Sequence, residues 1–538
     1  MKLFGLVSIA LLVCVIALLM FVLGVATAKY KFFPLAQLNR LSRTALHIVG
    51  TGGIDPKEVA RQYSRDTETI ALERKIDTGL LPLKINGIRL SESYPVPKVA
   101  GGITSIGNTV LVLDRLGNIY SCSPAGDVTK LSFPPLPNNM AEYLRSGGPL
   151  DTKSLRAYSI KYLGDSGLIV VSHELFDPQQ DATRMAVSVI GFDSGSMKSV
   201  GAWKTIFSGD LEPGGSNDAS GGRLAVAGRD KILLAMGVYK LNGDNSAQEL
   251  NSTFGKILEI TVSTQNVKML SRGHRNPQGL VVTKAGQIFS TEHGPLGGDE
   301  LNLITEGANY AWPVVTLGVD YNTYGWEHEH PAGKHAGYQL PVFAWVPSIA
   351  VSNLIQVGGF SDRWDGDLLV ASLKDQSLFR LRLDGDRVLY SEPIWLGQRI
   401  RDIAQLSNST IALWTDDAQL LFMSVDNERL SSNKRLPESI GDTLVYSCMY
   451  CHHLGPTSAA DVAPSLSDIF ERSIASDNFR YSAALRSKEG TWNEDSVRAF
   501  LSNPGQFASG TAMPSPNLTS DGIDEVIRAL KQLSDHTN

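Results

Sequence analysis

A chain of 538 residues is too long for one compact core, so we expect at least two domains. An apolar share of 43% and a charged share of 19% exclude a largely disordered protein, and a net charge of −6 spread along the chain argues against nucleic-acid binding. The 50 Gly and 25 Pro, with few long helical patterns, favour a turn-rich β architecture for most of the chain.

The amino terminus carries an apolar run from Leu3 to Ala28, which is long enough to cross a bilayer as a helix. Residues 1–28 are either a retained signal anchor or a cleaved signal peptide, because Ala26-Thr27-Ala28 has the small-x-small pattern of a cleavage site. We favour the transmembrane anchor, since the apolar run is longer than a usual signal core. Residues 29–99 follow as a mixed lead-in segment to which we assign no chemistry.

Residues 100–426 have a different sequence pattern, in which short β-rich runs recur and end at Gly, Asp or Asn. Typical runs are Thr109–Asp114, Gly167–Ser172 and Asp367–Ser372, and about six such units occur at irregular spacing. Small antiparallel sheets repeated around an axis form a β-propeller. We therefore predict a six-bladed β-propeller over residues 100–426, with one or two β-sandwiches as the alternative.

A polar linker is predicted for residues 427–436, and a helical pattern then indicates a small all-α domain over residues 437–538. This domain contains Cys448-Met-Tyr-Cys451-His452, which has the form Cys-x-x-Cys-His. The two thiols can each add to a vinyl group of a haem, and the His can then bind the iron. A redox dithiol or half of a zinc site is the alternative, but no other Cys lies nearby and the pair lies in no βαβ unit.

The domain also offers a second axial ligand, because Met513 lies in a loop with Gly510 and Pro514, about 60 residues after the haem motif. Residues 436–534 resemble a class I cytochrome c. The matching features are Cys448, Cys451, His452, Trp492, the Asn503-Pro504 turn, Met513 and the last helix.

This resemblance implies one covalent haem c whose iron is bound by His452 and Met513, an arrangement that suits electron transfer. It also selects His452 over its neighbour His453 as the proximal ligand. Haem attachment to such a motif occurs on the outer side of the bacterial inner membrane, so we expect the bulk of the chain in the periplasm.

Within the predicted propeller, three stretches are dense in polar residues and turns, namely 273–279, 291–302 and 307–313. Cationic side chains lie near the strand ends of different units. They are Arg275, Lys374, Arg399 and Arg401. In a propeller these cations could converge on the central channel and bind a multiply anionic small molecule. The alternative is separate solvated charges, or salt bridges with Asp299, Glu300 and Asp402.

Residues 100–416 resemble the soluble-type glucose/sorbosone dehydrogenases, which are aldose sugar dehydrogenases that carry pyrroloquinoline quinone (PQQ). The resemblance is strongest over residues 273–313 and 345–402. It implies that PQQ is bound by Arg275, Asn276, Lys374, Arg399 and Arg401. It further implies that the backbone carbonyls of Gly294 and Pro295 bind calcium and that Asp299 faces the sugar.

The sequence departs from this family at the catalytic base. The family places a His just before a Gly-Gly-Arg-Leu-type strand, and that His takes the proton of the sugar hydroxyl. Here the run is Asp218-Ala219-Ser-Gly-Gly-Arg-Leu, so Ala219 stands at the His position. An early Gln of the family is also missing from residues 151–158. The remaining candidates for the base are Asp218, His293 and His173.

Two functions follow from these patterns. The first is a membrane-anchored periplasmic quinohaemoprotein that oxidises a sugar or related alcohol at PQQ. Its electrons would pass through haem c to a downstream cytochrome, an oxidase or a quinone-linked acceptor. The alternative, motivated by Ala219, is a catalytically inactive propeller that serves as a binding or docking module on an electron-transfer cytochrome c.

Overall fold

The computed structural model describes most of the chain between Arg74 and Asp535. The described residues are 74–90, 99–148, 155–212, 220–238, 245–319, 333–428, 444–449, 452–454, 463–479, 481–511, 513, 515–516 and 518–535. The predicted anchor (residues 1–28) lies outside these ranges. In the part of the chain that they cover, no helix is both long and apolar enough to span a bilayer.

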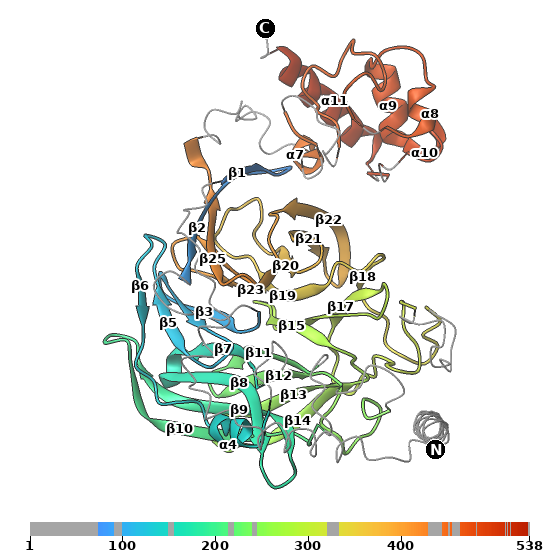
Figure 1. The fold of residues 1–538 in the computed structure, drawn as a ribbon. Coiled ribbons are helices and arrows are strands. Elements are labelled where there is room, and N and C mark those ends of the chain that lie inside the picture. Colours follow the sequence, from blue (N-terminus) through green and yellow to red (C-terminus); the bar gives the residue numbers. More distant parts are fainter. Residues whose placement is uncertain are drawn as a thin grey trace, which may run out of the picture.

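Six antiparallel sheets form the main body of the protein (Figure 1). The first is built from β3 (Gly102–Ile106), β4 (Thr109–Leu113), β5 (Ile119–Cys122) and β6 (Val128–Lys130). The second contains β7 (Ala157–Leu163), β8 (Leu168–Asp177), β9 (Ala182–Asp193) and β10 (Lys198–Ser208). The third contains β11 (Gly221–Gly228), β12 (Lys231–Met236), β13 (Lys256–Thr261) and β14 (Val267–Arg272).

The remaining sheets complete the set. The fourth contains β15 (Pro277–Val282), β16 (Ile288–Glu292), β17 (Asp299–Leu303) and β18 (Phe343–Trp345). The fifth contains β19 (Val351–Gln356), β20 (Leu368–Ser372), β21 (Ser377–Asp384) and β22 (Arg387–Trp395). The sixth joins β23 (Ile400–Gln405), β24 (Ile411–Thr415) and β25 (Gln419–Val425) to β2 (Pro82–Arg89) and β1 (Arg74–Asp77).

The innermost strand of each sheet contacts the innermost strand of the next sheet. These strands are, in order, β3, β7, β11, β15, β19 and β23, and β23 contacts β3. This closed ring of innermost strands confirms the predicted six-bladed β-propeller. Outside the strands, α4 (Met140–Arg145) and a 3₁₀ turn (Gly164–Ser166) lie in loops of the first two sheets.

The ring is closed by a strand from the amino-terminal side. Strand β2 pairs with β25 along its length, from Leu83 opposite Val425 to Arg89 opposite Gln419. Strand β1 then adds a fifth strand at the outer edge. The segment predicted only as a lead-in, residues 29–99, thus supplies two strands of the sixth sheet.

The core lies between neighbouring sheets. Between the second and third sheets, for example, Val170 and Val187 pack with Leu224 and Leu234, and none of these side chains is exposed. Because both faces of a blade are covered, its central strands are continuously apolar rather than alternating. Burial of each such side chain stabilises the fold by about 1.5–3 kcal/mol.

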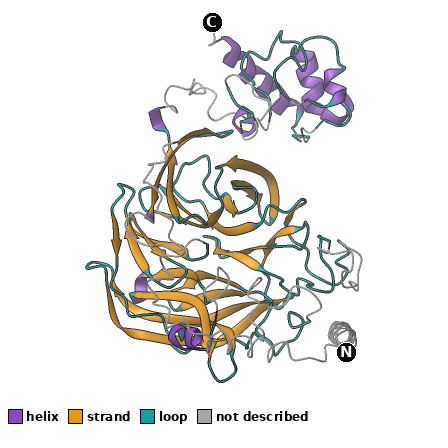
Figure 2. Cartoon of the chain, in the orientation of Figure 1, coloured by secondary structure: helices purple, strands orange, loops and turns teal. Residues whose placement is uncertain are grey.

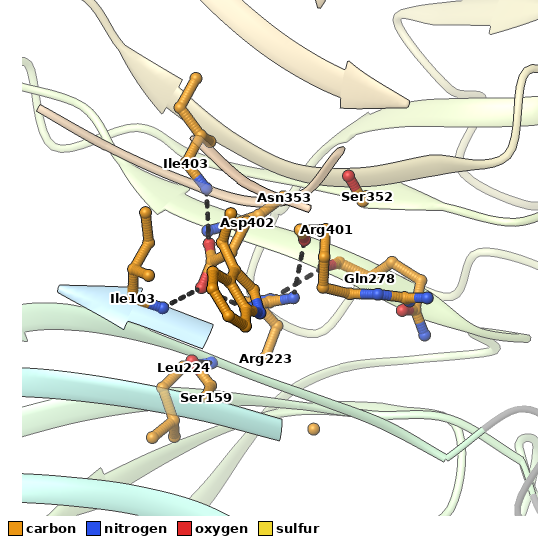
Figure 3. Close-up of polar contacts among 12 residues, drawn as sticks. Ile103, Ser159, Arg223, Leu224, Gln278, Ser352, Asn353, Arg401, Asp402 and Ile403 are labelled. Atoms are coloured by element: carbon orange, nitrogen blue, oxygen red, sulfur yellow. Dashed lines mark hydrogen bonds and ion pairs between the residues drawn. The ribbon is translucent and has the colours of Figure 1, made fainter. Parts of the chain in front are cut away.

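A buried ion pair joins the sheets at the axis (Figure 3). The carboxylate of Asp402 accepts hydrogen bonds from Arg223 Nη1 (2.8 Å), the amide of Ile103 (2.8 Å) and Asn353 Nδ2 (2.6 Å). Arg223 in turn donates to the carbonyl of Gln278 (3.0 Å). These contacts connect five of the six sheets through side chains that water does not reach.

The helices of the carboxy-terminal region gather in one body beyond β1, which is labelled in Figure 1; Figure 2 shows the same view with helices in purple. They are α7 (Val445–Cys448), α8 (Ala483–Arg486), α9 (Glu494–Ser502), α10 (Pro504–Phe507) and α11 (Ser520–Asp535). Helix α9 begins at a capping box, in which Asn493 and Ser496 exchange hydrogen bonds. Its buried Val497 and Leu501 belong to the same apolar cluster as Val526 and Leu530 of α11, which packs against α9. The predicted small all-α domain is therefore present.

Candidate active site

The site lies at one end of the channel, called here the entry end. The innermost strands all begin there, as shown by contacts between their first residues: Gly101 donates to the carbonyl of Ala157, and Ser352 Oγ donates to that of Ile400 (2.6 Å). Each innermost strand is antiparallel to the second strand of its sheet, so the second strands end there. Loops that leave β16 and β20 therefore meet at this end with the residues that precede β15 and β23.

A pocket of about 500 Å³ opens at the entry end. Its lining residues are His293, Gly294, Pro295, Leu296, Gly297, Asp299, Val346, Pro347, Ser348, Ala350 and Lys374. Five of these were predicted from the sequence, namely His293, Gly294, Pro295, Asp299 and Lys374. We call this cavity the entry pocket.

Arg275 lies directly behind the entry pocket, two residues before β15, and is only 4% exposed. Its Nη1 donates to the carbonyls of His293 (3.0 Å) and Gly294 (2.9 Å), and its guanidinium lies 5.2 Å from the centre of the Trp312 ring. The backbone amide of Arg275 donates to the carboxylate of Glu292. These contacts fix the loop after β16 to the start of β15.

Glu292 belongs to a buried chain of polar groups that the sequence did not reveal. Its other oxygen accepts from His274 Nδ1 (2.9 Å), whose Nε2 bonds Ser271 Oγ (2.8 Å). The His274 ring stacks on Tyr310 with centroids 4.6 Å apart. The chain holds the backbone of Arg275 in place, so these residues position a candidate ligand-binding cation.

Asp299 is almost fully buried at the floor of the entry pocket. Its Oδ1 accepts from the amide of Gly294 (3.1 Å) and its Oδ2 from the amide of Val351 (3.2 Å). The carboxylate thus joins the fourth and fifth sheets. A carboxylate oxygen accepts more than one hydrogen bond, so Asp299 can also bind a substrate hydroxyl.

His293 is held in one tautomer. Its Nε2 lies 2.5 Å from the carbonyl oxygen of Val351, and because a carbonyl can only accept, Nε2 carries the proton. Burial lowers the pKa of His293, although the nearby Asp299 opposes this effect. The imidazole is therefore neutral at pH 7, with Nδ1 as its acceptor.

Arg399 and Arg401, at the start of β23, share the carboxylate of Asp416. Arg399 Nε donates to Oδ2 (3.0 Å), and Arg401 donates to Oδ1 from Nε (2.8 Å) and to Oδ2 from Nη2 (3.0 Å). Burial acts to raise the pKa of Asp416, but the two guanidinium groups hold it below its usual value. The acidic partner of these arginines is thus Asp416 and not Asp402, which binds Arg223.

The predicted cations do converge. Lys374 lines the entry pocket, Arg399 Nη1 donates to the carbonyl of the adjacent Leu373 (3.3 Å), and the charges of Arg275 and Arg401 both act on His293. Asn276 is buried beside them, and its carbonyl accepts from the amide of His293 (3.1 Å). The site combines several cations with a neutral imidazole and one buried carboxylate.

A second polar cluster at the entry end was missed by the sequence analysis. Arg156 precedes β7 as Arg275 precedes β15, and its amide donates to Glu174 (3.1 Å) in β8. Tyr158 donates its hydroxyl proton to the same carboxylate. Burial, assisted by Glu174, raises the pKa of Glu212 to about 8. The cluster's signal in the sequence was the position of Arg156 just before an apolar strand.

Asp218 and His173 were also candidates for the base that takes the proton of the substrate hydroxyl. Asp218 and Ala219 lie outside the described residues. His173 is fully buried within the second sheet, where Nδ1 bonds the carbonyl of Glu174 (2.9 Å) and Nε2 bonds Ser188 Oγ (2.9 Å). Burial lowers the pKa of His173 to about 4. His173 is therefore a structural residue and not a base.

In the α domain, His452 follows α7 and is partly buried. Its Nδ1 lies 2.7 Å from the carbonyl oxygen of Pro464, so Nδ1 carries the proton and Nε2 keeps its lone pair. A metal-binding imidazole is commonly oriented in this way. Cys448 at the end of α7 and Met513 are partly buried and pack against the domain's apolar cluster, whereas Cys451 lies outside the described residues.

Comparison with known proteins covers both parts of the chain. A family model described as glucose/sorbosone dehydrogenase matches residues 102–422. Aldose sugar dehydrogenase YliI of Escherichia coli is 32% identical over 229 residues, which cover 38% of this chain and 60% of that protein. Cytochrome c-554 of Methylosinus trichosporium is 34% identical over 82 residues, which cover 15% of this chain and 62% of that one.

Among solved structures, the soluble aldose sugar dehydrogenase of Escherichia coli in its apo form has a TM-score of 0.54 at 24% sequence identity. The match covers 63% of this chain and 99% of that chain. At this level of identity the likeness supports the propeller fold alone.

Proposed function

Because this chain belongs to the glucose/sorbosone dehydrogenase family and carries a cytochrome c-like domain, we propose that it is a quinohaemoprotein that oxidises a sugar or related alcohol. The oxidation would take place at PQQ in the entry pocket, and haem c would receive the electrons. One observation carries the proposal: the pocket gathers His293, Asp299 and Lys374 beside the buried Arg275, on the same chain as a haem-binding motif.

The residues at the entry end fit PQQ, which bears three carboxylates. Lys374 lines the pocket, Arg275 contacts the carbonyl of the lining residue Gly294, and Arg399 contacts the carbonyl of Leu373 next to Lys374. With Arg401, whose charge acts on His293, these cations can hold such an anion by charge-assisted hydrogen bonds. A volume of about 500 Å³ lies within the range of small-molecule sites. When bound, PQQ accepts the hydride that leaves the carbinol carbon.

We assign the proton to His293. Its Nδ1 accepts the proton of the substrate hydroxyl, while the hydrogen bond from Nε2 to Val351 holds the ring in place. The carboxylate of Asp299 stabilises the imidazolium that forms and binds a second hydroxyl of the substrate. Asp218, outside the described residues, is the other candidate for this role.

In the α domain, Cys448 and Cys451 would attach the haem, and His452 and Met513 would bind its iron. Iron bound by His and Met would supply one-electron transfer rather than oxygen chemistry. A downstream cytochrome, an oxidase or a quinone-linked protein would accept the electrons. The tether raises the effective concentration of haem at the propeller without any new contact.

We further propose that residues 1–28 anchor the protein in the bacterial inner membrane with its bulk in the periplasm. The apolar run and the need to attach haem outside the cytoplasm support this location.

The test is reduction of the haem by substrate. The full-length haem protein is loaded with PQQ and mixed with a panel of aldoses and alcohols, and the absorption band of the reduced haem is followed. The proposal predicts reduction by at least one aldose. A haem that dithionite reduces but no member of the panel reduces would contradict it.

A docking module without catalysis is the second candidate, favoured by Ala219 at the position of the family's base. The same experiment separates the two functions. A docking module would leave the haem oxidised with every substrate, and titration would show no tight binding of PQQ.

A further inference from the structure

Three buried oxygen atoms between the second and third sheets have no hydrogen-bond partner in the part of the chain that the structure describes. They are Glu212 Oε2, Thr183 Oγ1 and Ser220 Oγ. The three residues are only 2%, 5% and 4% exposed. A buried oxygen without a partner is costly, and a bound water or ion usually satisfies it.

The fold places these oxygens close together. Glu212, which follows β10, forms an isolated antiparallel bridge with Thr183 of β9, and its amide donates to the carbonyl of Thr183 (2.7 Å). Residues opposite each other in such a bridge have their Cβ atoms about 4.5–5.5 Å apart on one face. Burial is the main influence on the pKa of Glu212, and Ser220 lies near enough to oppose it, although no hydrogen bond of normal geometry joins them.

A second carboxylate lies on the same face. Thr183 is opposite Phe176 of β8, and Glu174 comes two residues before Phe176, so its side chain points to the same side of the sheet. Glu174 is fully buried and accepts from the hydroxyl of Tyr158 and the amide of Arg156. The side chain of Arg156 adds a cation, whose Nε lies 3.8 Å from Glu174 Oε1.

Charge decides which ligand fits this cluster. Glu174 and Glu212 carry two negative charges when both are ionised, and Arg156 supplies one positive charge. The cluster then holds one excess negative charge in a place that water hardly reaches, which is unfavourable. A monovalent cation removes the excess, whereas a divalent ion would reverse it. A bound water would satisfy the oxygens but not the charge.

We propose that Glu212, Thr183 and Ser220 bind an alkali-metal cation, Na⁺ or K⁺, between the second and third sheets. Carboxylate and hydroxyl oxygens are the ligand type that hard cations prefer. The ion would tie β9 and the segment after β10 to the start of β11. The site is separate from the entry pocket, and the inference is independent of the proposed function.

A proton would take the place of the ion in the cation-free protein. Burial first, and then Glu174, raise the pKa of Glu212 to about 8. The neutral carboxyl removes the same excess charge that a bound cation would balance. Tests for the cation are therefore made at a pH above this value, where a proton competes least.

The experiment follows thermal unfolding of the full-length protein, without quinone, in choline chloride, NaCl and KCl at equal ionic strength. At about 100 times the dissociation constant of the ion, the melting temperature should rise by about 4 °C over choline in at least one of the two salts. Equal melting temperatures in all three salts would overturn the proposal and leave an ordered water at the site.

Three variants locate the effect. Glu212→Gln keeps the shape of the side chain without its charge and should abolish the rise. Thr183→Val replaces the hydroxyl by a methyl group and should shift the dependence on salt to about tenfold higher concentration. Glu249→Gln removes an exposed carboxylate and should keep the full rise.

Circular dichroism in choline verifies that each variant folds before the salts are compared. A rise that persists unchanged in Glu212→Gln would contradict the assignment, because the ion would then bind elsewhere. No step of the experiment needs PQQ, a sugar or haem reduction, so failure of the proposed function would leave this result intact.

Discussion

Replacement of Asp402 by Ala tests whether the axial ion pair holds the propeller together. Asp402 is fully buried and Arg223 is 4% exposed, so the variant leaves a guanidinium without its carboxylate in a site that water does not reach. Breaking a buried pair on one side costs about 3–5 kcal/mol. The amides of Ile103 and Asn353 lose their acceptors as well. We therefore expect a loss near the upper end of that range.

The loss is measured by denaturant unfolding followed through the fluorescence of the buried Trp364 and Trp414. For a body of this size the unfolding entropy is about 0.7 kcal/mol/K, so a loss of about 5 kcal/mol should lower the melting temperature by about 7 °C. Glu306→Ala breaks the exposed pair with Lys268 and should leave the stability almost unchanged, because water and salt screen exposed ion pairs.

A double variant sharpens the test. If the penalty comes from an uncompensated buried charge, Arg223→Met combined with Asp402→Leu should cost less than Asp402→Ala alone. A loss below about 1 kcal/mol in the single variant would refute this reasoning. Strict additivity of the two substitutions would refute it as well.

Three further predictions concern the sites. Glu212 has a pKa raised to about 8, above its unfolded value, so the stability it contributes is lost as pH rises from about 4.5 to about 8. Glu212→Gln cannot ionise and should gain stability relative to the wild type over this interval, by up to about 5 kcal/mol, whereas equal pH slopes in urea unfolding would contradict the assignment. His293→Gln should slow haem reduction by sugar at least about 100-fold while dithionite still reduces the haem, and an unchanged rate would exclude His293 as the base. Met513→Ala should lower the haem potential measured by redox titration, because loss of the thioether removes the ligand that raises it, and an unchanged potential would exclude Met513.

The six apolar runs seen in the sequence correspond to strands near the channel, and this is why the blade number could be predicted. The run from Thr109 became β4 and that from Asp367 became β20, and both strands are buried on their two faces. Outer strands gave weaker signals because one face meets solvent, as in β22. Strand β2 was missed because its mixed sequence lacks a local signal. Its partner, β25, is the last strand of the propeller in the sequence, so their pairing could not be inferred from neighbouring residues.

In the candidate site, too, some features could be predicted from the sequence and others could not. The four cations could be named because each lies near the end of a strand, and such positions meet at one end of a propeller. Gly294, Pro295 and Asp299 were named through the family resemblance. Their partners could not be inferred, because pairing depends on packing between sheets. Asp402 was considered as a partner of the site arginines but binds Arg223 instead, while Asp416 serves Arg399 and Arg401.

The closure of the ring by β2 also fixes where the rest of the chain departs. Leu83 of β2 lies opposite Val425, the last residue of β25, and Lys75 of β1 lies 3.7 Å from Asp426. The chain toward the amino terminus and the chain toward the α domain therefore leave the propeller from the same sheet.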